Sequence, residues 1–486
     1  MTAAPGRYPL AVIGAGPGGL EAVATAAEHG VETLLVDAYA FPGGQYYKQI
    51  PAEFSALDRT RRQAEATELA RRVRHPSVRY LSGTLTWGIF PYDHGQGWEL
   101  ALYGSHDLSR VIATKLILAP GAYDRPAPFP GWTLPGVMTA GAVQSLIKSQ
   151  RVLPGRRFLL SGTGPLQLAV AAALVRAGGE VVAVLEAAHI GWRDLRYAAA
   201  AWGQWERLAE GWEYLQDLRS ARVPVRRGWS VVAAQGTEQV EAATVARLGE
   251  GWQPVAGTEQ RIAIDTIVTG YGFVPANELS RLAGCEHVYS PDQGGWVPVR
   301  DDEMRTTQPG VYVVGDAGGI AGAVAARMEA RIAALSVARD LLATGKAERD
   351  LAGARRQLAR ERRFARATAA LFAPGPGLDA LATDETIICR CEGVTLGEIR
   401  AAVRDGARTA GEVKGMTCAS MGNCQGRICG TVLPRFVARE LAALGLPPAA
   451  SEALTVRPPI HPLALTALAG LVQVEPATAV HTSLPS

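Results

Sequence analysis

The stretch YPLAVIGAGPGG, residues 8–19, decides the fold of the N-terminal part of the chain. An apolar run of strand length, Tyr8 to Ile13, leads into a glycine-rich turn and then into the helix-like stretch LEAVATAAEHG. A second strand-like run, ETLLVD, ends in Asp37. This order, with an acid about 20 residues beyond the glycines, predicts a βαβ unit that binds a dinucleotide.

The chemistry of this site rests on the turn and on the acid. In such a turn, backbone N–H groups at the helix start point toward a phosphate, and glycine lets the pyrophosphate approach closely. Ribose hydroxyls would donate hydrogen bonds to the acid. A GxGxxG pattern alone also occurs in ordinary tight turns, but here the flanking strand, helix and acid are all present. The predicted contacts are Gly14, Gly16, Pro17, Gly19 and Asp37.

A second unit of the same kind begins near Pro154, and its first loop glycine follows that of the first unit by 148 positions. The strand RRFLLSG leads into a glycine turn, the helix LQLAVAAALVRAGG and the strand EVVAVLE. Gln167 stands where a small residue would let helix and strand pack closely. A second nucleotide site and a structural remnant of a duplicated domain both remain open. The candidate contacts are Gly162, Gly164, Pro165 and Glu186.

A third motif, TTQPGVYVVGDAGG at 306–319, reads as a strand, a turn and a helix start. Gly315 and Asp316 bring one carboxylate and several backbone amides to the end of an apolar strand. Such a group suits the hydroxyl-rich ribityl chain and the phosphate of a flavin. Elsewhere, residues 54–74 read as a helix and 78–103 as a β-meander.

Five of the six cysteines lie late in the chain, and four of them form a C-x-C…C-x4-C pattern. Four thiolates in this pattern can hold one zinc ion or one [2Fe–2S] cluster. The intervening residues read as two short helices, and the module resembles the bacterioferritin-associated-ferredoxin type of [2Fe–2S] domain. That resemblance favours iron–sulfur; zinc and unliganded thiols remain the alternatives. The predicted ligands are Cys389, Cys391, Cys424 and Cys429.

The other two cysteines fall outside this pattern. Cys418 is not counted as a ligand, and Cys285 is predicted to be a buried apolar residue.

Composition sets the broad class. The chain has 486 residues, enough for about two to four domains, with 48% hydrophobic and 20% charged residues and a net charge of +3. This charge does not favour nucleic acid as a partner. No apolar run reaches the roughly 18 residues of a membrane helix, and the N-terminus does not read as a signal peptide. We predict a cytoplasmic protein.

Residues 8–340 resemble the two-dinucleotide-domain flavoproteins typified by glutathione and thioredoxin reductases. The resemblance implies that the first loop and the Gly315–Asp316 motif bind FAD and that the middle loop binds NAD(P)H. It adds Gly44 and Gln45 of FPGGQYY (41–47) and Gly121 of LILAPGA (116–122) to the FAD contacts. Because no cysteine pair lies near 41–50 or 130–150, a thiol–disulfide reductase is not expected.

The predicted fold class is α/β, with two glutathione-reductase-like Rossmann domains and a small helical [2Fe–2S] domain. The FAD-binding domain would comprise 1–125 and 297–345, on either side of a second dinucleotide-binding domain. The predicted parts in chain order are 1–125, 126–296, 297–345, a helical linker 346–385, the [2Fe–2S] domain 386–445 and a tail 446–486.

Three further stretches look like the larger, α-type chain of multimeric amino-acid dehydrogenases. They are GAYDRPAPFPGWTLPGVMTAGAVQ (121–144), GYGFVPANELSRLAGC (270–285) and CRCEGVTLGEIRAAV (389–403). That group includes opine oxidases, hydroxyproline and proline dehydrogenases and hydrogen cyanide synthase, and the resemblance covers nearly the whole chain. It implies an electron-relaying subunit that contains FAD and [2Fe–2S].

The same resemblance implies a set of partners. A flavoprotein β subunit would oxidise the amino or imino acid, and FMN would sit between the subunits. Some members add a small ferredoxin-like subunit. The complex would attach peripherally to a membrane through a quinone acceptor, and NAD(P) or ATP would fill the second nucleotide site.

The sequence assigns no catalytic residue, because no Ser-His-Asp, paired-carboxylate or arginine-clamp constellation is evident. An arginine-rich helix at 349–366 is compatible with an acidic partner or FMN phosphate, and equally with a solvated connecting helix. Two rival functions stay open. One is a self-sufficient NAD(P)H-dependent FAD/iron–sulfur reductase, and the other is a zinc-binding scaffold on a decayed flavoprotein fold.

Overall fold

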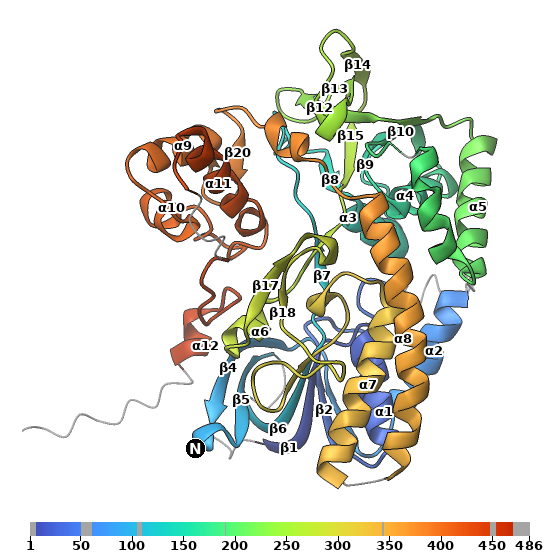
Figure 1. Cartoon of the computed structure of the whole chain (residues 1–486), viewed down its shortest axis with the longest axis vertical. Helices are drawn as coiled ribbons and strands as arrows, with labels where there is room; N and C mark the ends of the chain where they lie inside the picture. The colour runs from blue at the N-terminus through green and yellow to red at the C-terminus, as the bar shows by residue number, and fades with distance from the viewer. Residues whose placement is uncertain are drawn as a thin grey trace, which may run out of the picture.

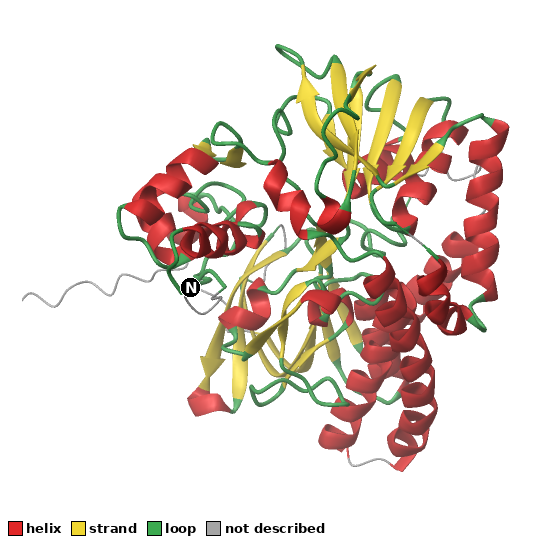
Figure 2. Cartoon of the chain, turned by 45° about the horizontal axis from the view of Figure 1, so that its top comes forward, coloured by secondary structure: helices red, strands yellow, loops and turns green. Residues whose placement is uncertain are grey.

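The computed structural model describes residues 6–49, 61–104, 109–189, 191–342, 345–447 and 453–469. Two sheet-based bodies are stacked along the long axis, and a mainly helical body lies beside the upper one (Figure 1). Figure 2 shows the strands gathered in two separate groups with helices around them. The predicted α/β class, with two dinucleotide-binding domains and a small helical domain, is confirmed.

The lower sheet has the strand order β3-β2-β1-β6-β5-β4, with β19 paired to β6. Strands β1, β2, β3, β6 and β19 are parallel, whereas β4 and β5 form an antiparallel arm. The predicted meander over 78–103 is therefore wrong in part, because β3 pairs in parallel with β2. The strands are β1 (Gly6–Ile13), β2 (Thr33–Val36), β3 (Val78–Leu81), β4 (Leu85–Tyr92), β5 (Gly97–Tyr103), β6 (Arg110–Leu118) and β19 (Val311–Val313).

Helices α1 (Pro17–Glu28) and α7 (Ala323–Leu342) pack together on this sheet. Small buried side chains such as Ala22 and Ala330 let the two helix axes approach closely. Helix α2 (Arg61–Val73) covers part of the predicted helix 54–74, and residues 54–60 lie outside the described residues. Because β1 and β19 run parallel, the glycine turns that follow them open at the same edge of the sheet.

The upper sheet repeats this plan with the parallel order β11-β10-β9-β15-β8. A three-stranded antiparallel sheet of β12, β13 and β14 packs beside it. The strands are β8 (Val137–Thr139), β9 (Arg157–Gly162), β10 (Glu180–Glu186), β11 (Val225–Arg227), β12 (Trp229–Gln235), β13 (Ala242–Arg247), β14 (Gln260–Ala263) and β15 (Thr266–Gly270). Its helices are α3 (Ala140–Ser145), α4 (Pro165–Arg176) and α5 (Trp205–Ser220).

Two short connections join the sheet bodies. Strand β7 (Ala122–Asp124) carries the chain upward and pairs with β16 (Phe273–Pro275), which carries it back. Helix α6 (Glu278–Leu282) and the hairpin of β17 (His287–Ser290) and β18 (Gly295–Pro298) follow at this junction. Strand β7 therefore lies at the junction between the lower and upper sheet bodies.

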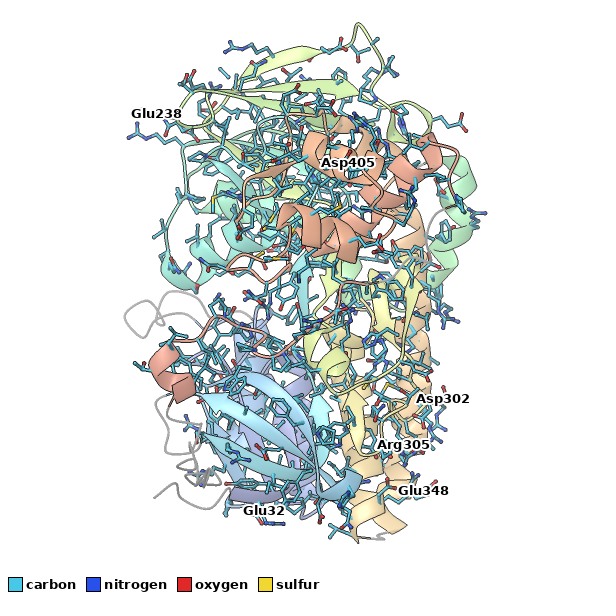
Figure 3. All side chains as sticks on the ribbon, turned by 90° about the vertical axis from the view of Figure 1, so that its left-hand side faces the viewer. Glu32, Glu238, Asp302, Arg305, Glu348 and Asp405 are labelled. Carbon is cyan, nitrogen blue, oxygen red and sulfur yellow. The ribbon has the colours of Figure 1, made fainter. Side chains whose placement is uncertain are left out.

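Helix α8 (Gly345–Leu371) runs along α7 and reaches the upper body (Figure 1). Several of its arginines bind acids of the flavoprotein body: Arg355 pairs with Glu303 at 2.7 Å and Arg362 with Glu329 at 2.8 Å. Figure 3 labels Arg305 and Glu348 along the edge that α7 and α8 form. The arginine-rich helix is thus more than a solvated connection, because part of its charge is neutralised inside the molecule.

The C-terminal domain has a core of its own, formed around Ile399, Val413 and Phe436. Helices α9 and α10 are the two short helices predicted between the cysteines, and each begins with a capping box that fixes its first turn. The elements are β20 (Ile387–Cys389), β21 (Val394–Thr395), α9 (Leu396–Arg404), α10 (Ala410–Thr417) and α11 (Leu433–Ala443). Asp405 marks this domain in Figure 3, and Glu32 marks the lower body.

Of the predicted tail 446–486, residues 446–447 and 453–469 are described, and the latter segment returns to the lower body and ends in α12 (Leu465–Ala469). Ile460 is buried there, and its backbone N–H donates to the carbonyl of Trp87 at 3.1 Å. The rest of the predicted tail, 448–452 and 470–486, lies outside the described residues. No helix in the described ranges is long and apolar enough to cross a membrane.

Candidate functional site

The first glycine loop has the backbone that only glycine permits. Gly14 has a φ of +100°, and a Cβ there would lie 2.3 Å from the carbonyl oxygen of Ala119. A Cβ on Gly19 would lie 1.7 Å from the carbonyl oxygen of Gly14. Helix α1 starts at Pro17, immediately after the turn, so its free N–H groups face the space in front of the loop.

Asp37, at the end of β2, is held by two backbone groups. Its Oδ2 accepts a hydrogen bond from the N–H of Ala15 at 2.5 Å and its Oδ1 accepts one from Tyr39 at 2.7 Å. Burial raises the pKa of Asp37 and these N–H donors oppose the increase. The carboxylate is thereby fixed beside the loop, where a ribose would meet it.

The Gly315–Asp316 motif follows β19. Oδ1 of Asp316 accepts hydrogen bonds from the backbone N–H groups of Ala321 and Gly322, both at 3.0 Å. Burial raises the pKa of Asp316. Arg300 donates to the carbonyl oxygens of Val313 at 2.7 Å and Gly318 at 2.6 Å, which fixes both ends of the turn.

The residues that the family resemblance adds, Gly44, Gln45 and Gly121, lie beside these flavin-binding motifs. Gly44 has a φ of +58°, and a Cβ there would lie 2.9 Å from Cα of Gly16, so the 43–47 loop packs on the first loop. Oε1 of Gln45 accepts a hydrogen bond from Ser145 at 2.9 Å. Gly121 has a φ of +85°, and a Cβ there would meet no atom within 4 Å, so it borders open space.

These loops surround one cavity of about 2300 Å³ that crosses all three bodies. Of the ten predicted FAD contacts, nine line it; Gly19 does not, because it packs on Gly14. The lining contacts are Gly14, Gly16, Pro17, Asp37, Gly44, Gln45, Gly121, Gly315 and Asp316. The same cavity reaches Gly164 and Pro165 of the second loop and Cys424 of the C-terminal domain.

The second glycine loop also has an acid at the end of the following strand that binds the loop backbone. The carboxylate of Glu186 accepts hydrogen bonds from the backbone N–H groups of Gly164 and Ala188, both at 2.9 Å. A Cβ on Gly162 would lie 2.1 Å from the carbonyl oxygen of Gly270. Burial raises the pKa of Glu186. Gly162 and Glu186 shape the loop from behind and do not line the cavity.

Two features distinguish the second loop from a free nucleotide site. Gln167 is 1% exposed, and neither polar atom of its amide has a hydrogen-bond partner among the described residues. The ring of Phe372, just beyond α8, lies 3.7 Å from where a Cβ on Gly164 would be. The end of α8 therefore packs onto the loop at the point where a phosphate would approach.

The four predicted cluster ligands meet in the C-terminal domain. The Cys424 thiol lies beside those of Cys391 and Cys429, and the Cys429 thiol lies beside that of Cys389. The Cys429 thiol beside it lowers the pKa of Cys424 to about 5. Within the described ranges, no three His, Cys, Asp or Glu side chains close on a single metal ion. These residues supply the four thiolates that a [2Fe–2S] cluster or a zinc ion would use.

The loop before the second cysteine pair adds donors to the sulfurs. The backbone N–H of Ser420 donates to Sγ of Cys389 at 3.5 Å, and Oγ of Ser420 lies 3.0 Å from Sγ of Cys429. Hydrogen bonds of this kind tune iron–sulfur centres. Cys389 and Cys429 are buried, whereas Cys391 is exposed.

The remaining cysteines take no part in this set. Cys418 ends α10 in a left-handed conformation and is exposed. Cys285 is buried, as predicted, and donates to Oγ1 of Thr306 at 3.3 Å. Burial raises the pKa of the Cys285 thiol.

Sequence reasoning missed Arg427, which lies between Cys424 and Cys429. It donates from Nε to the hydroxyl of Tyr123 on β7 at 2.8 Å and forms an ion pair with Glu278 at 3.5 Å. The position of Arg427 inside the CQGRIC motif was the feature of the sequence that could have pointed to it. Its partners, more than a hundred residues earlier, could not be read from the sequence.

The two glycine loops, the two loop acids, the Gly315–Asp316 turn and the thiol set define a flavin-type oxidoreductase with an iron–sulfur domain. The family model of pyridine nucleotide-disulphide oxidoreductases matches residues 8–330, and the BFD-like [2Fe-2S] binding domain matches 387–434. The chain belongs to the pyridine nucleotide-disulphide oxidoreductase family, in the branch that includes the A chain of opine oxidase and the HcnB chain of hydrogen cyanide synthase. These domains assign FAD to the flavoprotein body and a [2Fe–2S] cluster to the C-terminal domain.

Three curated relatives span most of the chain. HcnB of Pseudomonas protegens is 33% identical over 91% of this chain and 98% of its own length. The A chain of opine oxidase from Agrobacterium tumefaciens is 33% identical over 96% of this chain and 92% of its own length. The alpha chain of sarcosine oxidase from Rhizobium meliloti is 26% identical over 95% of this chain but only 42% of its own length.

Solved structures show the same fold. L-proline dehydrogenase from P. horikoshii superposes with a TM-score of 0.66 at 19% identity, over 96% of this chain and 80% of that one. T. acidophilum thioredoxin reductase gives 0.51 at 18% identity, over 69% of this chain and 98% of that one.

Proposed function

We propose that this chain is the FAD- and [2Fe–2S]-containing electron-transfer subunit of a heteromeric amino- or imino-acid dehydrogenase. The opine, hydroxyproline/proline and glycine-oxidising hydrogen cyanide synthase types are the candidates. Support comes from the relatives that match over nearly the whole chain, which are named as subunits of opine oxidase and hydrogen cyanide synthase.

The observation that carries the proposal is the single cavity shared by the flavin loops and Cys424. FAD supplies two-electron chemistry when bound, and a [2Fe–2S] cluster supplies one-electron chemistry. The residues that would hold FAD and one of the four thiol ligands border the same space. The chain would thus bring a two-electron centre and a one-electron centre together.

Under this proposal the amino-acid site lies on a partner. The partner would be a flavoprotein β subunit, joined in some complexes by a small ferredoxin-like subunit, with FMN at the interface. Near the cluster, Arg427 is already paired with Glu278, and Asp124 accepts a hydrogen bond from Thr139 at 2.7 Å. The polar residues there bind one another, which supports a relaying role over substrate chemistry.

The rival is a self-sufficient NAD(P)H-dependent reductase, and the intact Gly164–Glu186 contact favours it. The ring of Phe372 against Gly164 and the buried amide of Gln167 oppose it. NAD(P) or ATP in the second loop would first have to displace that ring.

An anaerobic visible spectrum of the purified chain, recorded before and after adding NADH or NADPH, decides between the two. A relay subunit retains its flavin and iron–sulfur absorption after either nicotinamide is added. Rapid bleaching by NADH or NADPH would overturn the relay proposal and establish the reductase.

A further inference from the structure

The C-terminal domain touches the flavoprotein body through a small set of polar and apolar contacts. Nε1 of Trp132 donates to the carbonyl of Ile387 at 2.6 Å, and Ile428 packs against the core of the upper body. Covalently, the domain is connected through residues 372–386, which follow α8, and through the tail that returns to the lower body at Ile460. The position of this domain therefore depends on its noncovalent contacts.

Arg427 contacts the flavoprotein body at two residues, Tyr123 and Glu278. Besides the bonds to Tyr123 and Glu278, its Nη1 donates to the carbonyl oxygens of Ile460 at 2.8 Å and Cys424 at 3.3 Å. One guanidinium group thus joins the cysteine loop to β7, to α6 and to the C-terminal segment. Its Nη2 also lies 3.4 Å from Nε2 of His461.

This contact is shielded from water. The side chains of Arg427 and Glu278 are 13% and 17% exposed. Burial raises the pKa of Glu278, while the charge of Arg427 opposes that increase. A shielded arginine with several planar donors holds its neighbours in a fixed geometry, which the point charge of a lysine does not reproduce.

The contact also orients the cysteine set. Cys424, whose carbonyl Arg427 binds, lines the cavity that contains Tyr123 and Gly121. Cys391 is exposed instead. The cysteine set thereby presents Cys424 to the flavin-binding space and Cys391 to the surface.

We propose that Arg427 is the positioning residue that docks the [2Fe–2S] domain on the flavoprotein body and turns its Cys424 edge toward the flavin cavity. Tyr123 and Glu278 form its receiving site. The purpose of this docking rests on the proposed relay function, but the docking itself is a property of the chain alone.

Two variants on opposite sides of the contact test it in the full-length holoprotein. Arg427→Gln removes the charge and most of the donors, whereas Tyr123→Phe removes one acceptor without touching the cysteine domain. Arg408→Gln is the matched control, because among the described residues the guanidinium of Arg408 bonds to carbonyls within its own domain, those of Val403 and Ala407. Arg427→Lys tests whether charge alone is sufficient.

Hydrogen–deuterium exchange at residues 121–125 and 424–430 measures docking directly. Losing a charge-assisted hydrogen bond should raise the undocked-to-docked ratio by roughly tenfold or more, so exchange at both segments should rise by that factor in Arg427→Gln. A smaller rise is expected in Tyr123→Phe and none in Arg408→Gln. Unchanged exchange in both Arg427→Gln and Tyr123→Phe would overturn the proposal.

The rate of cluster reduction after photoreduction of the flavin gives the functional readout. We expect it to fall in Arg427→Gln and only partly recover in Arg427→Lys, with cluster content and direct reduction by dithionite unchanged. If wild type shows no flavin-to-cluster transfer, the relay function fails, while the exchange data still decide the docking. An Arg427→Gln rate equal to wild type would overturn the positioning role.

Discussion

Glu329, buried on α7, accepts a hydrogen bond from the backbone N–H of Gly315 at 3.0 Å and so ties the flavin-binding turn to that helix. The same carboxylate binds Arg300 at 3.0 Å and Arg362 of α8 at 2.8 Å. Burial alone would raise the pKa of Glu329, and the two arginines hold it below its ordinary value. Helix α8 thereby supports the FAD site from behind, without touching the cavity at that point.

Replacing Glu329 by glutamine keeps the shape of the side chain but leaves two arginines without their buried counter-charge. Breaking a buried ion pair in this way costs about 3 kcal/mol. We expect the free energy of unfolding to fall by about that amount and FAD to bind more weakly, as measured by denaturant titration and flavin fluorescence. Glu348→Gln, whose side chain is 62% exposed, should change neither, and an equal effect in both variants would refute this role of Glu329.

Replacing Gly14 by alanine should abolish FAD binding. The added Cβ would overlap the carbonyl of Ala119, and the φ of +100° adds backbone strain. Flavin content of the purified variant is the measurement. Gly353→Ala, at an exposed position within α8, is the control and should retain flavin and gain up to about 1 kcal/mol of stability.

Replacing Phe372 by alanine should uncover the second glycine loop. We expect NADPH to bind about tenfold more tightly, equivalent to about 1.4 kcal/mol, because the ring no longer packs on Gly164. Quenching of protein fluorescence by NADPH measures the affinity. Phe364→Ala is the matched control, since that ring packs on Arg207 at 4.7 Å. Unaltered affinity in Phe372→Ala would show that the ring is no obstacle.

The parts of this site that could be predicted are those encoded locally. Gly14, Asp37 and Asp316 each follow an apolar strand, so the sequence order places them at the same sheet edge. The predicted pairing direction of β3 was wrong, because alternation of apolar and polar side chains along a strand does not show whether its neighbour is parallel or belongs to a hairpin.

Contacts between distant segments could not be predicted. Arg427 and Tyr123 are 304 positions apart, and Phe372 follows Gly164 by more than two hundred positions. Nothing in either local pattern indicates the partner. The helical content and the four thiols of the C-terminal domain were predictable, whereas the way the domain docks was not.

Stability should depend on pH through His287. Its Nδ1 donates to the carbonyl oxygen of Cys285 at 2.8 Å, its Nε2 lies 3.0 Å from Oγ of Ser280, and burial lowers its pKa to about 4. Because the unfolded chain binds this proton near pH 6.5 and the folded chain only near pH 4, stability is full above pH 6.5 and declines as the pH falls from 6.5 to 4.

Replacing His287 by glutamine should flatten the stability curve in that window. Between pH 6.5 and pH 4, the free energy of unfolding should fall by about 2–3 kcal/mol more in wild type than in the variant. Denaturant unfolding at a series of pH values measures it. His75→Gln, at an exposed site, should leave the curve unchanged. A His287→Gln curve parallel to wild type would contradict the assignment.

Replacing Ser420 by alanine should lower the midpoint potential of the cluster. The hydroxyl lies 3.0 Å from Sγ of Cys429, and losing a hydrogen bond to a ligand sulfur stabilises the oxidised form. The expected shift is about 20–60 mV, from a bond of about 0.5–1.5 kcal/mol in a one-electron couple. Cys418→Ser should leave both potential and cluster content unchanged, and loss of the cluster there would require a different ligand set.

Electron transfer between the flavin body and the cluster, within this one chain, is the central step of the proposed function. Electron paramagnetic resonance of the purified holoprotein, frozen after anaerobic photoreduction of the flavin without nicotinamide or partner, tests it most directly. We expect the signal of a reduced [2Fe–2S] cluster to grow as the flavin absorption is restored. A flavin that stays bleached while the cluster remains silent would contradict the proposed relay.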